Sequence, residues 1–141
     1  MKLNSASLAK LKGVHPDLVR VVNRCAGDWK DADTSFIVTC GVRTLEEQKI
    51  LKAKRASKTL RSRHIPAANG FSHAVDLACT IKGQVRWDWP LYDILANRMK
   101  AAAKAENVPL EAGADWVSFK DGPHFQLPWK QYPGTKTGAK T

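Results

Sequence analysis

Short strand-like segments and longer helical segments follow one another in this chain without a regular alternation. Three segments, at residues 35–40, 74–79 and 124–127, are short, mostly apolar and bounded by turn residues, which is typical of buried strands. A regular alternation of strands and helices would indicate a parallel sheet, and its absence favours antiparallel pairing. The sequence therefore predicts an α+β fold, in which a small, mostly antiparallel sheet is flanked by helices.

Helical periodicity is clearest in three places. Pro16 suits the first turn of a helix. Thr44 and Glu47 form a capping box, from which a second helix is expected to reach about residue 56. A third helix is expected over residues 89–107, where apolar residues recur with the helical period. The predicted apolar face of this third helix consists of Leu91, Ile94, Leu95, Met99 and Ala102.

The length and composition are those of one globular domain. The chain has 141 residues, of which 43% are hydrophobic, enough to form a substantial core. We expect one catalytic or binding domain over residues 1–134 and a flexible basic tail over residues 135–141. The first residues lack the uninterrupted apolar run of a secretory signal, and no stretch approaches the length of a membrane span.

The chain is strongly basic, with a formal net charge of +10, which favours an anionic partner. Part of this charge lies in a basic run that no acidic residue interrupts. The run consists of Lys49, Lys52, Lys54, Arg55, Lys58, Arg61 and Arg63. It is either a solvated surface or a patch that binds an anionic polymer. A nucleic-acid-binding module is disfavoured, because the run contains none of the aromatic residues on which bases stack.

Three cysteines, Cys25, Cys40 and Cys79, are far apart and form no Cys-x-x-Cys pair. A zinc site built from thiolates is therefore not predicted. Buried cysteine behaves as a small hydrophobic residue, so we expect free and mostly buried thiols. Free thiols suit a protein made in a reducing cytoplasm.

Histidines and aspartates gather in two polar segments. Residues 62–76 contain His64, His73 and Asp76, and a later segment begins at Asp121 and ends at His124. A hydrolytic zinc keeps three protein ligands and one open position for water, and a nearby carboxylate takes the proton of that water. His64, Asp76, His124 and Asp121 fill these four places. Histidines on strands are also common as core or surface residues, so spacing alone leaves that second reading open.

The alternation of side chains along a strand bears on which histidines face a metal. His73 and Asp76 are three residues apart, so on one strand they point to opposite faces. If Asp76 faces the metal, His73 faces away, and His64 on the preceding loop is free to approach. A bend at the edge of the strand would reverse this choice, so His73 remains the alternative ligand. On the later strand, His124 and Gln126 share a face.

Several motifs occur in a recognisable order. Ser62-Arg-His64 is followed by His73-Ala-Val-Asp76, and Asp121-Gly-Pro-His124 comes later. This order resembles the Ser-x-His, Ala-x-Asp and acid-x-x-His signatures of the zinc D-Ala-D-Ala carboxypeptidase family, which includes phage L-alanyl-D-glutamate endopeptidases. Trp89-Pro-Leu-Tyr92 and Gly113-Ala-Asp-Trp116 look like the phage branch. The resemblance covers roughly residues 14–134 and implies the small Hedgehog/DD-peptidase type of α+β fold.

The resemblance implies a role for each matching residue. It makes His64, Asp76 and His124 the ligands of Zn²⁺ and Asp121 the general base. It makes Arg43 the residue that holds a substrate carboxylate or the developing oxyanion, which suits a permanently charged guanidinium; the alternative for Arg43 is a structural salt bridge. Further residues are candidates to bind substrate or support the site, and for the last two of them simple packing is the equal alternative. They are Ser62, Gln48, Asp115 and Trp116.

Two departures from the family pattern lie in and near these motifs. Residues 66–71 lengthen the loop between His64 and Asp76, and Ser72 stands where the simplest family pattern has glycine. This longer loop is expected to shape the substrate cleft. The base is an aspartate, Asp121, where some members have the longer glutamate, so its carboxylate must lie closer to the metal.

The resemblance implies a peptidoglycan-degrading zinc endopeptidase, an endolysin that hydrolyses the L-alanyl–D-glutamate bond of the stem peptide. The alternative within the same family is a D-Ala-D-Ala carboxypeptidase or dipeptidase. We expect a monomer that accumulates in the host bacterial cytoplasm and reaches the periplasm and cell wall at lysis. Its basic run is then a candidate for contact with anionic outer-membrane lipopolysaccharide.

Overall fold

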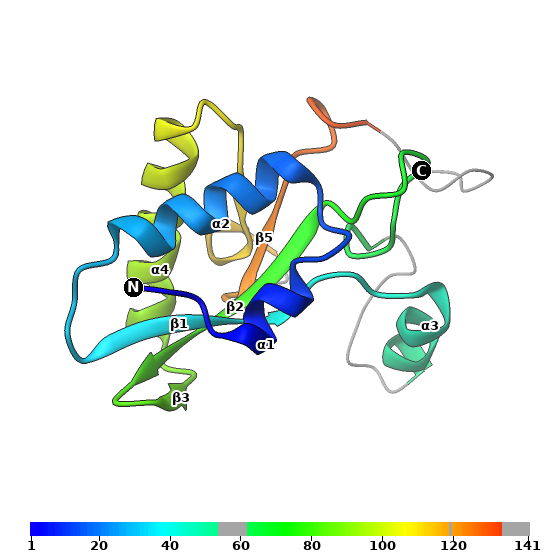
Figure 1. Cartoon of the computed structure of the whole chain (residues 1–141). Coiled ribbons are helices and arrows are strands. Elements are labelled where there is room, and N and C mark those ends of the chain that lie inside the picture. Colours follow the sequence, from blue (N-terminus) through cyan, green and yellow to red (C-terminus); the bar gives the residue numbers. More distant parts are fainter. Residues whose placement is uncertain (54–61, 119, 134–141) are drawn as a thin grey trace.

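The structure is a computed structural model that describes residues 1–53, 62–118 and 120–133 (Figure 1). Within these residues the chain forms four α-helices, one short 3₁₀-helix and five strands. In chain order they are α1 (Ser5–Lys10), α2 (Pro16–Asp28), β1 (Thr34–Cys40), α3 (Leu45–Ala53), β2 (Ala74–Ile81), β3 (Gln84–Arg86), α4 (Trp89–Ala105), β4 (Glu111–Ala112), η1 (Gly113–Asp115) and β5 (His124–Gln126).

All strand pairs of the described sheet are antiparallel, which confirms the predicted α+β fold. The strand order is β1-β2-β5-β4, and β3 pairs with the end of β2 as a hairpin. The central strand β2 therefore has three neighbours along its length. Lys82 and Gly83 make the hairpin turn with positive φ angles of 51° and 81°.

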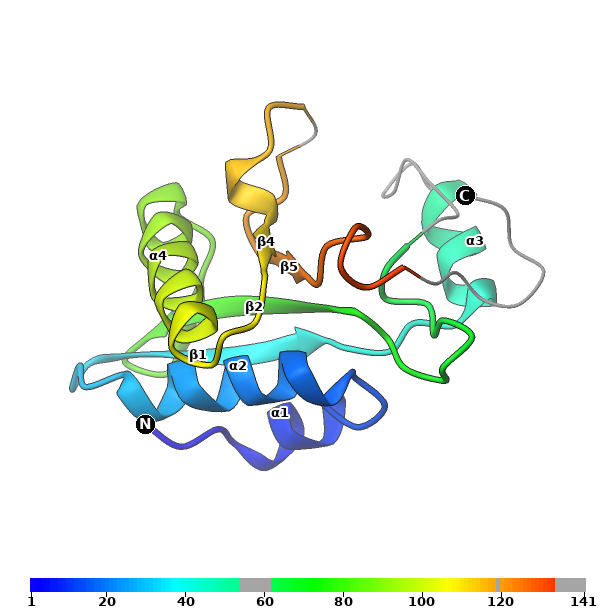
Figure 2. The ribbon, with the colours of Figure 1, turned by 90° about the horizontal axis from the view of Figure 1, so that it is seen from above.

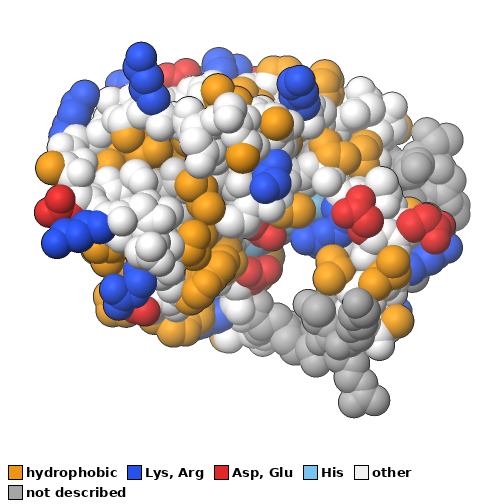
Figure 3. Space-filling view, turned by 60° about the horizontal axis from the view of Figure 1, so that its bottom comes forward, with side chains coloured by type: hydrophobic (Ala, Val, Ile, Leu, Met, Phe, Trp, Pro, Cys, Tyr) orange, Lys and Arg blue, Asp and Glu red, His pale blue; other side chains and the backbone are white. Residues whose placement is uncertain are grey.

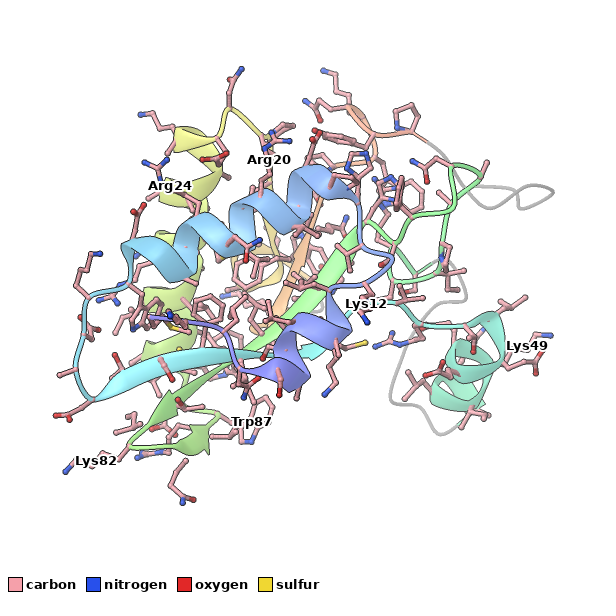
Figure 4. The ribbon with its side chains drawn as sticks, in the orientation of Figure 1. Lys12, Arg20, Arg24, Lys49, Lys82 and Trp87 are labelled. Carbon is pink, nitrogen blue, oxygen red and sulfur yellow. The ribbon has the colours of Figure 1, made fainter. Side chains whose placement is uncertain are left out.

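The helices are distributed around this sheet. Figures 1 and 2 show α1 and α2 on one face of the sheet, with α4 at one end of the molecule and α3 at the other. α2 packs against α4, and Arg24 on α2 pairs with Glu106 just after α4 at 3.2 Å. Arg20 and Arg24 lie together on α2 in Figure 4. The arrangement leaves α3, which follows β1, standing apart from the other helices.

The core lies between the sheet and the helices α2 and α4. Leu95, Met99 and Ala102 of α4 are buried, as their spacing predicted, but Ile94 is 42% exposed and does not belong to the core. Tyr92 is buried instead, because its ring packs against the turn at Gly122. Further buried core residues on α2 are Leu18, Val21, Val22 and Cys25.

Arg63 is not part of the basic surface that the sequence suggested. It is 3% exposed, and its guanidinium donates to the carbonyl oxygens of Leu127 at 2.9 Å and Tyr132 at 2.8 Å. The guanidinium also lies 4.1 Å from the centre of the Trp129 ring. Burial lowers the pKa of Arg63 to about 10. Arg63 therefore attaches the segment after β5 to the rest of the domain.

Other parts of the basic run and the tail are only partly described. Lys49 and Lys52 are exposed on α3. Lys54, Arg55, Lys58 and Arg61 lie outside the described residues, as do the predicted end of the second helix and the predicted tail. Among the helices of the described residues, none has the length and apolar character needed to cross a membrane.

Candidate active site

The register of β2 and β5 brings Asp76 and His124 together. The two residues are directly opposite in the antiparallel pair, so their side chains share one face of the sheet. His124 Nδ1 lies 3.2 Å from Asp76 Oδ1. Phe125, between His124 and Gln126, points to the other face and is completely buried, which fixes the strand.

His64 approaches the same carboxylate from the loop before β2. Its Nε2 is 3.1 Å from Asp76 Oδ1, and its Nδ1–H donates to the carbonyl oxygen of Gly41 at 2.8 Å. The backbone N–H of His64 donates to Ser62 Oγ at 3.1 Å. Ser62, a predicted substrate-binding residue, thus holds the backbone of His64. The ring is 2% exposed and points Nε2 at Asp76.

His73 points away from this group. Its ring lies 5.2 Å from that of His15 and 6.3 Å from that of Tyr132, centre to centre, and its Nε2 is 3.4 Å from Asn69 Nδ2. Burial and the nearby charge of Arg63 lower the pKa of His73 to about 4. The structure therefore places His64, rather than His73, beside Asp76 and His124.

A polar chain behind His124 fixes the orientation of its ring. Gln126 Nε2 donates to Glu111 Oε2 at 3.0 Å, so its Oε1 is the atom that faces His124 Nε2 at 2.8 Å. His124 Nε2–H is then the donor, and Nδ1 is left to face Asp76. Supporting partners of this kind commonly orient histidine ligands of metals. The alternation along residues 124–127 placed Gln126 on the correct face, but nothing in the sequence indicated Glu111.

The group favours a positive charge at its centre. Burial alone would disfavour an imidazolium, but the hydrogen bond and charge of Asp76 raise the pKa of His64 to about 10. Burial alone would raise the pKa of Asp76. The hydrogen bonds from His124 and His64 have the larger effect and hold this pKa far below its usual value. A carboxylate between two imidazoles is also a donor set that suits Zn²⁺.

Cys40 joins the site although its sequence context gave no sign of a metal-binding thiol. An irregularity in the β1–β2 pairing after Val38 places Cys40, rather than Thr39, opposite Asp76. Cys40 Sγ is 3.8 Å from His64 Nδ1. Ligand atoms of Cys40, His64 and Asp76 lie within 4.8 Å of one another, a spacing that a metal ion could bridge. The other two cysteines are free and buried, as expected.

Arg43 lies at the edge of the same group. Its Nη2 is 3.8 Å from Asp76 Oδ2 and 3.6 Å from Cys40 Sγ, and its backbone N–H donates to the carbonyl oxygen of His64. Nη1 donates to Gln48 Oε1 at 2.8 Å. The Gln48 side chain is completely buried on α3, so in this structure it holds Arg43 from behind. The predicted capping box of α3 is present, since Thr44 and Glu47 exchange hydrogen bonds.

Asp121 is held close to this group by its backbone. Its N–H donates to Gly113 O and its carbonyl oxygen accepts from His124 N–H, both at 3.1 Å. A Cβ at Gly113 would collide with the Asp121 carbonyl oxygen, so the close approach of η1 requires glycine there. Burial and the charge of Asp76 raise the pKa of Asp121. A carboxylate with a raised pKa is suited to accept and return a proton.

Asp115 and Trp116, the two remaining predicted residues, differ in position. The Trp116 ring lies 5.2 Å from the His124 ring, centre to centre. Asp115 instead pairs with Lys100 on α4 at 2.9 Å.

In Figure 3 a hollow opens on one face of the molecule. A histidine is visible there beside acidic and basic side chains, and hydrophobic side chains lie along one border.

Comparisons with known proteins agree with this geometry. The family model for the phage L-alanyl-D-glutamate peptidase matches residues 1–127. An L-alanyl-D-glutamate peptidase of Listeria phage A118 is 32% identical over 137 residues, which are 96% of this chain but 45% of that protein. The crystal structure of the Serratia marcescens L-Ala D-Glu endopeptidase ChiX has a TM-score of 0.80 at 36% identity and covers 94% of each chain. The chain therefore belongs to the phage L-alanyl-D-glutamate peptidase family.

Proposed function

We propose that this chain is a zinc endopeptidase that hydrolyses the L-alanyl–D-glutamate bond of peptidoglycan stem peptides. The observation that carries the proposal is the convergence of His64 and His124 on one Asp76 carboxylate oxygen, at 3.1 and 3.2 Å. Membership of the family supports the choice of bond. The catalytic domain is proposed to comprise residues 1–134.

His64, Asp76 and His124 are the proposed zinc ligands. Each histidine presents one ring nitrogen to Asp76 and uses the other for a hydrogen bond that fixes its orientation. A zinc ion held by these residues would supply the chemistry of a Lewis acid, which lowers the pKa of a bound water and polarises a carbonyl. Cys40 is proposed to remain beside the ligands, because the polar chain behind His124 already prepares that histidine for the third position.

Asp121 is the proposed general base. It takes a proton from the attacking water and gives it to the leaving amine of the D-glutamyl residue. Burial raises the pKa of Asp121, so its carboxylate binds this proton more readily than an exposed aspartate would. Arg43, held by Gln48, is placed to bind a free carboxylate of the substrate or the developing oxyanion.

The experiment that tests the function is a digest of purified Gram-negative peptidoglycan, with mass spectrometry of the released fragments. Fragments with a new N-terminal D-glutamate, lost after chelation of the metal, are the expected result. Release of terminal D-alanine alone would identify a D-Ala-D-Ala carboxypeptidase instead. Absence of any cleavage by the zinc-loaded protein would contradict both activities.

The partners and location follow from this activity as further proposals. The protein is proposed to act as a monomer, to be made in the host cytoplasm and to reach the cell wall at lysis. The basic run without the buried Arg63 is proposed to contact anionic lipopolysaccharide, so replacing Lys54, Arg55 and Lys58 by glutamine should weaken binding to cells in low salt. The same replacement at Lys12, Lys30 and Lys82, which are exposed elsewhere, is the control. Equal binding by both variants would discard this role.

A further inference from the structure

Two tryptophans, Trp87 just after β3 and Trp89 at the start of α4, are about half exposed. Trp87 is 57% exposed and Trp89 is 48% exposed. Both rings lie next to that of Tyr92, at 6.5 and 5.4 Å between centres. Figure 4 shows Trp87 at the edge of the molecule beside β3. Large apolar side chains that stay exposed as a group commonly mark a binding surface.

Both tryptophans are attached to well-fixed backbone. Arg86 and Asp88, on either side of Trp87, form an ion pair at 2.6 Å. Trp89 and Pro90 form the first turn of α4, for which Asp88 is the N-cap residue. The two indole rings therefore stand on the end of a hairpin and the start of a helix rather than on a long loop.

Tyr92 connects this aromatic pair to the turn formed by Asp121 and Gly122, called the catalytic turn below. Its ring is so close to Gly122 that a Cβ there would lie 2.6 Å from a ring carbon. Gly122 directly follows Asp121, the proposed base. Tyr92 and Asp121 also interact electrostatically. Burial raises the pKa of Tyr92, and the charge of Asp121 raises it further. Trp87 and Trp89 are thus one aromatic ring away from the catalytic turn.

The aromatic pair and Arg43 adjoin helices that lie at opposite ends of the molecule. Arg43 lies two residues before α3, whereas Trp89 begins α4, and Figure 2 shows these two helices at opposite ends of the molecule. A substrate that crosses the metal ligands from Arg43 would therefore extend towards α4. If Arg43 binds the carboxylate of the D-glutamyl residue, the L-alanyl residue lies on the side of the tryptophans.

The chemistry of peptidoglycan places a sugar on that side. The amino group of the L-alanyl residue is joined through a lactyl group to N-acetylmuramic acid, so a pyranose ring is only one residue away from the scissile bond. An extended residue spans about 3.5 Å, which puts this ring roughly 7–10 Å from the scissile carbonyl. The apolar C–H face of a pyranose stacks on a flat aromatic ring, and the N-acetyl group adds further apolar contact.

We propose that Trp87 and Trp89 form a subsite for the N-acetylmuramic acid residue that bears the stem peptide. This inference rests on the proposed function, because it assumes cleavage next to the L-alanyl residue. The subsite makes the enzyme prefer a peptide that is still attached to the glycan strand over the same peptide without its sugar.

The test compares two substrates, N-acetylmuramyl tripeptide and the same tripeptide with an acetyl group in place of the sugar. Removing roughly 60 Å² of apolar surface from water corresponds to about a tenfold difference in kcat/KM, which is the expected preference of the wild type for the sugar-bearing substrate. The double variant Trp87→Ala/Trp89→Ala should lose this preference and keep its kcat/KM for the sugar-free substrate. Replacement of both residues by Phe should retain part of the preference, and Leu8→Ala, at a residue that is 50% exposed on α1, should retain all of it.

The outcomes separate this inference from the proposed function. Equal cleavage of both substrates by the wild type would overturn the sugar subsite and leave the endopeptidase activity intact. A loss by the double variant that is equal on both substrates would show a structural role and would also overturn it. If the wild type were a dimer and the double variant a monomer, the tryptophans would belong to a dimer interface, and this result would also overturn the sugar subsite. Cleavage of neither substrate by the zinc-loaded wild type would overturn the proposed function together with the subsite.

Discussion

Asp76 is the residue on which the charge balance of the site depends. One of its oxygen atoms lies within hydrogen-bond distance of both His64 and His124, and the histidines keep its pKa far below the usual value. A proton on His64, whose pKa is raised to about 10, supplies positive charge beside this carboxylate. A metal ion would supply the same charge, so we expect zinc binding to release protons from the site.

At Asp121, the substitution Asp121→Asn is expected to lower kcat by about 10²–10⁴-fold, because an amide does not accept the proton of the attacking water. Zinc content should be unchanged, since Asp121 is not a proposed ligand. Asp115→Asn is the matched control, because Asp115 lies nearby in sequence but pairs with Lys100. The measurement is kcat on stem peptides. If kcat of Asp121→Asn falls no more than that of Asp115→Asn, Asp121 is not the general base.

The individual residues of the site were predictable to different degrees. The residue types and the family signature pointed to His64, Asp76 and His124, and strand alternation favoured His64 over His73. Gln48 and Ser62 were predicted to bind substrate or to support the site, and the structure shows supporting contacts, with Gln48 behind Arg43 and Ser62 holding the backbone of His64. Such supporting roles depend on side-chain geometry, which a sequence pattern does not contain.

Among the elements, β2 organises the site. It carries Asp76 and pairs with both β1 and β5, so each neighbour contributes one polar side chain beside that carboxylate. The strand itself was predicted from the sequence, but the irregular pairing at Thr39 was not. Because a strand with one extra residue looks like any other strand in the sequence, the position of Cys40 in the site could not be foreseen.

Helix α4 shows a similar limit of pattern analysis. Its existence and extent were predicted well, since the helix spans Trp89–Ala105. Periodicity alone placed Ile94 in the core, whereas the structure buries Tyr92. The difference arises because the turn at Gly122 accepts the Tyr92 ring, and this contact joins segments that are far apart in the sequence.

The close contact between η1 and the turn before β5 gives a prediction for Gly113→Ala. A Cβ at this position meets the backbone carbonyl of Asp121, which cannot move without displacing the base. We therefore expect a large loss of kcat with retained zinc binding, measured on stem peptides and by metal analysis. Gly27→Ala is the control, because a Cβ there has open space and alanine stabilises a helix by about 0.5–1 kcal/mol relative to glycine. Full activity of Gly113→Ala would contradict the proposed tight turn.

At the scale of the whole molecule, distant segments secure the long loop before β2. Ser72 N–H donates to Gly13 O and the Ser72 carbonyl oxygen accepts from His15 N–H, which ties the loop to the start of α2. Tyr132 near the end of the described chain donates to Asp17 at 2.7 Å. The resemblance to the family implied that this loop is longer than in the simplest members. Its attachment to the start of α2 was visible only in the structure.

The buried His73 gives a prediction for stability against pH. The pKa of His73 is about 4 in the folded chain against 6.5 for the ordinary side chain. Between these two pH values the unfolded chain binds a proton at His73 and the folded chain does not. The contribution of neutral His73 to the free energy of unfolding is therefore complete above pH 6.5. This free energy decreases by up to about 3 kcal/mol as the pH falls towards 4. Urea unfolding in the presence of a chelator should show a shallower loss for His73→Gln than for the wild type. Parallel pH profiles would contradict a neutral, buried His73.

The most direct test of the proposed metal centre is the zinc content of two matched variants, His64→Ala and His73→Ala, measured by mass spectrometry of the purified metal-loaded proteins. We expect about one zinc per chain in the wild type and in His73→Ala, and little or none in His64→Ala, because only His64 faces Asp76 and His124. Zinc retained by His64→Ala but lost by His73→Ala would show that His73, and not His64, is the ligand.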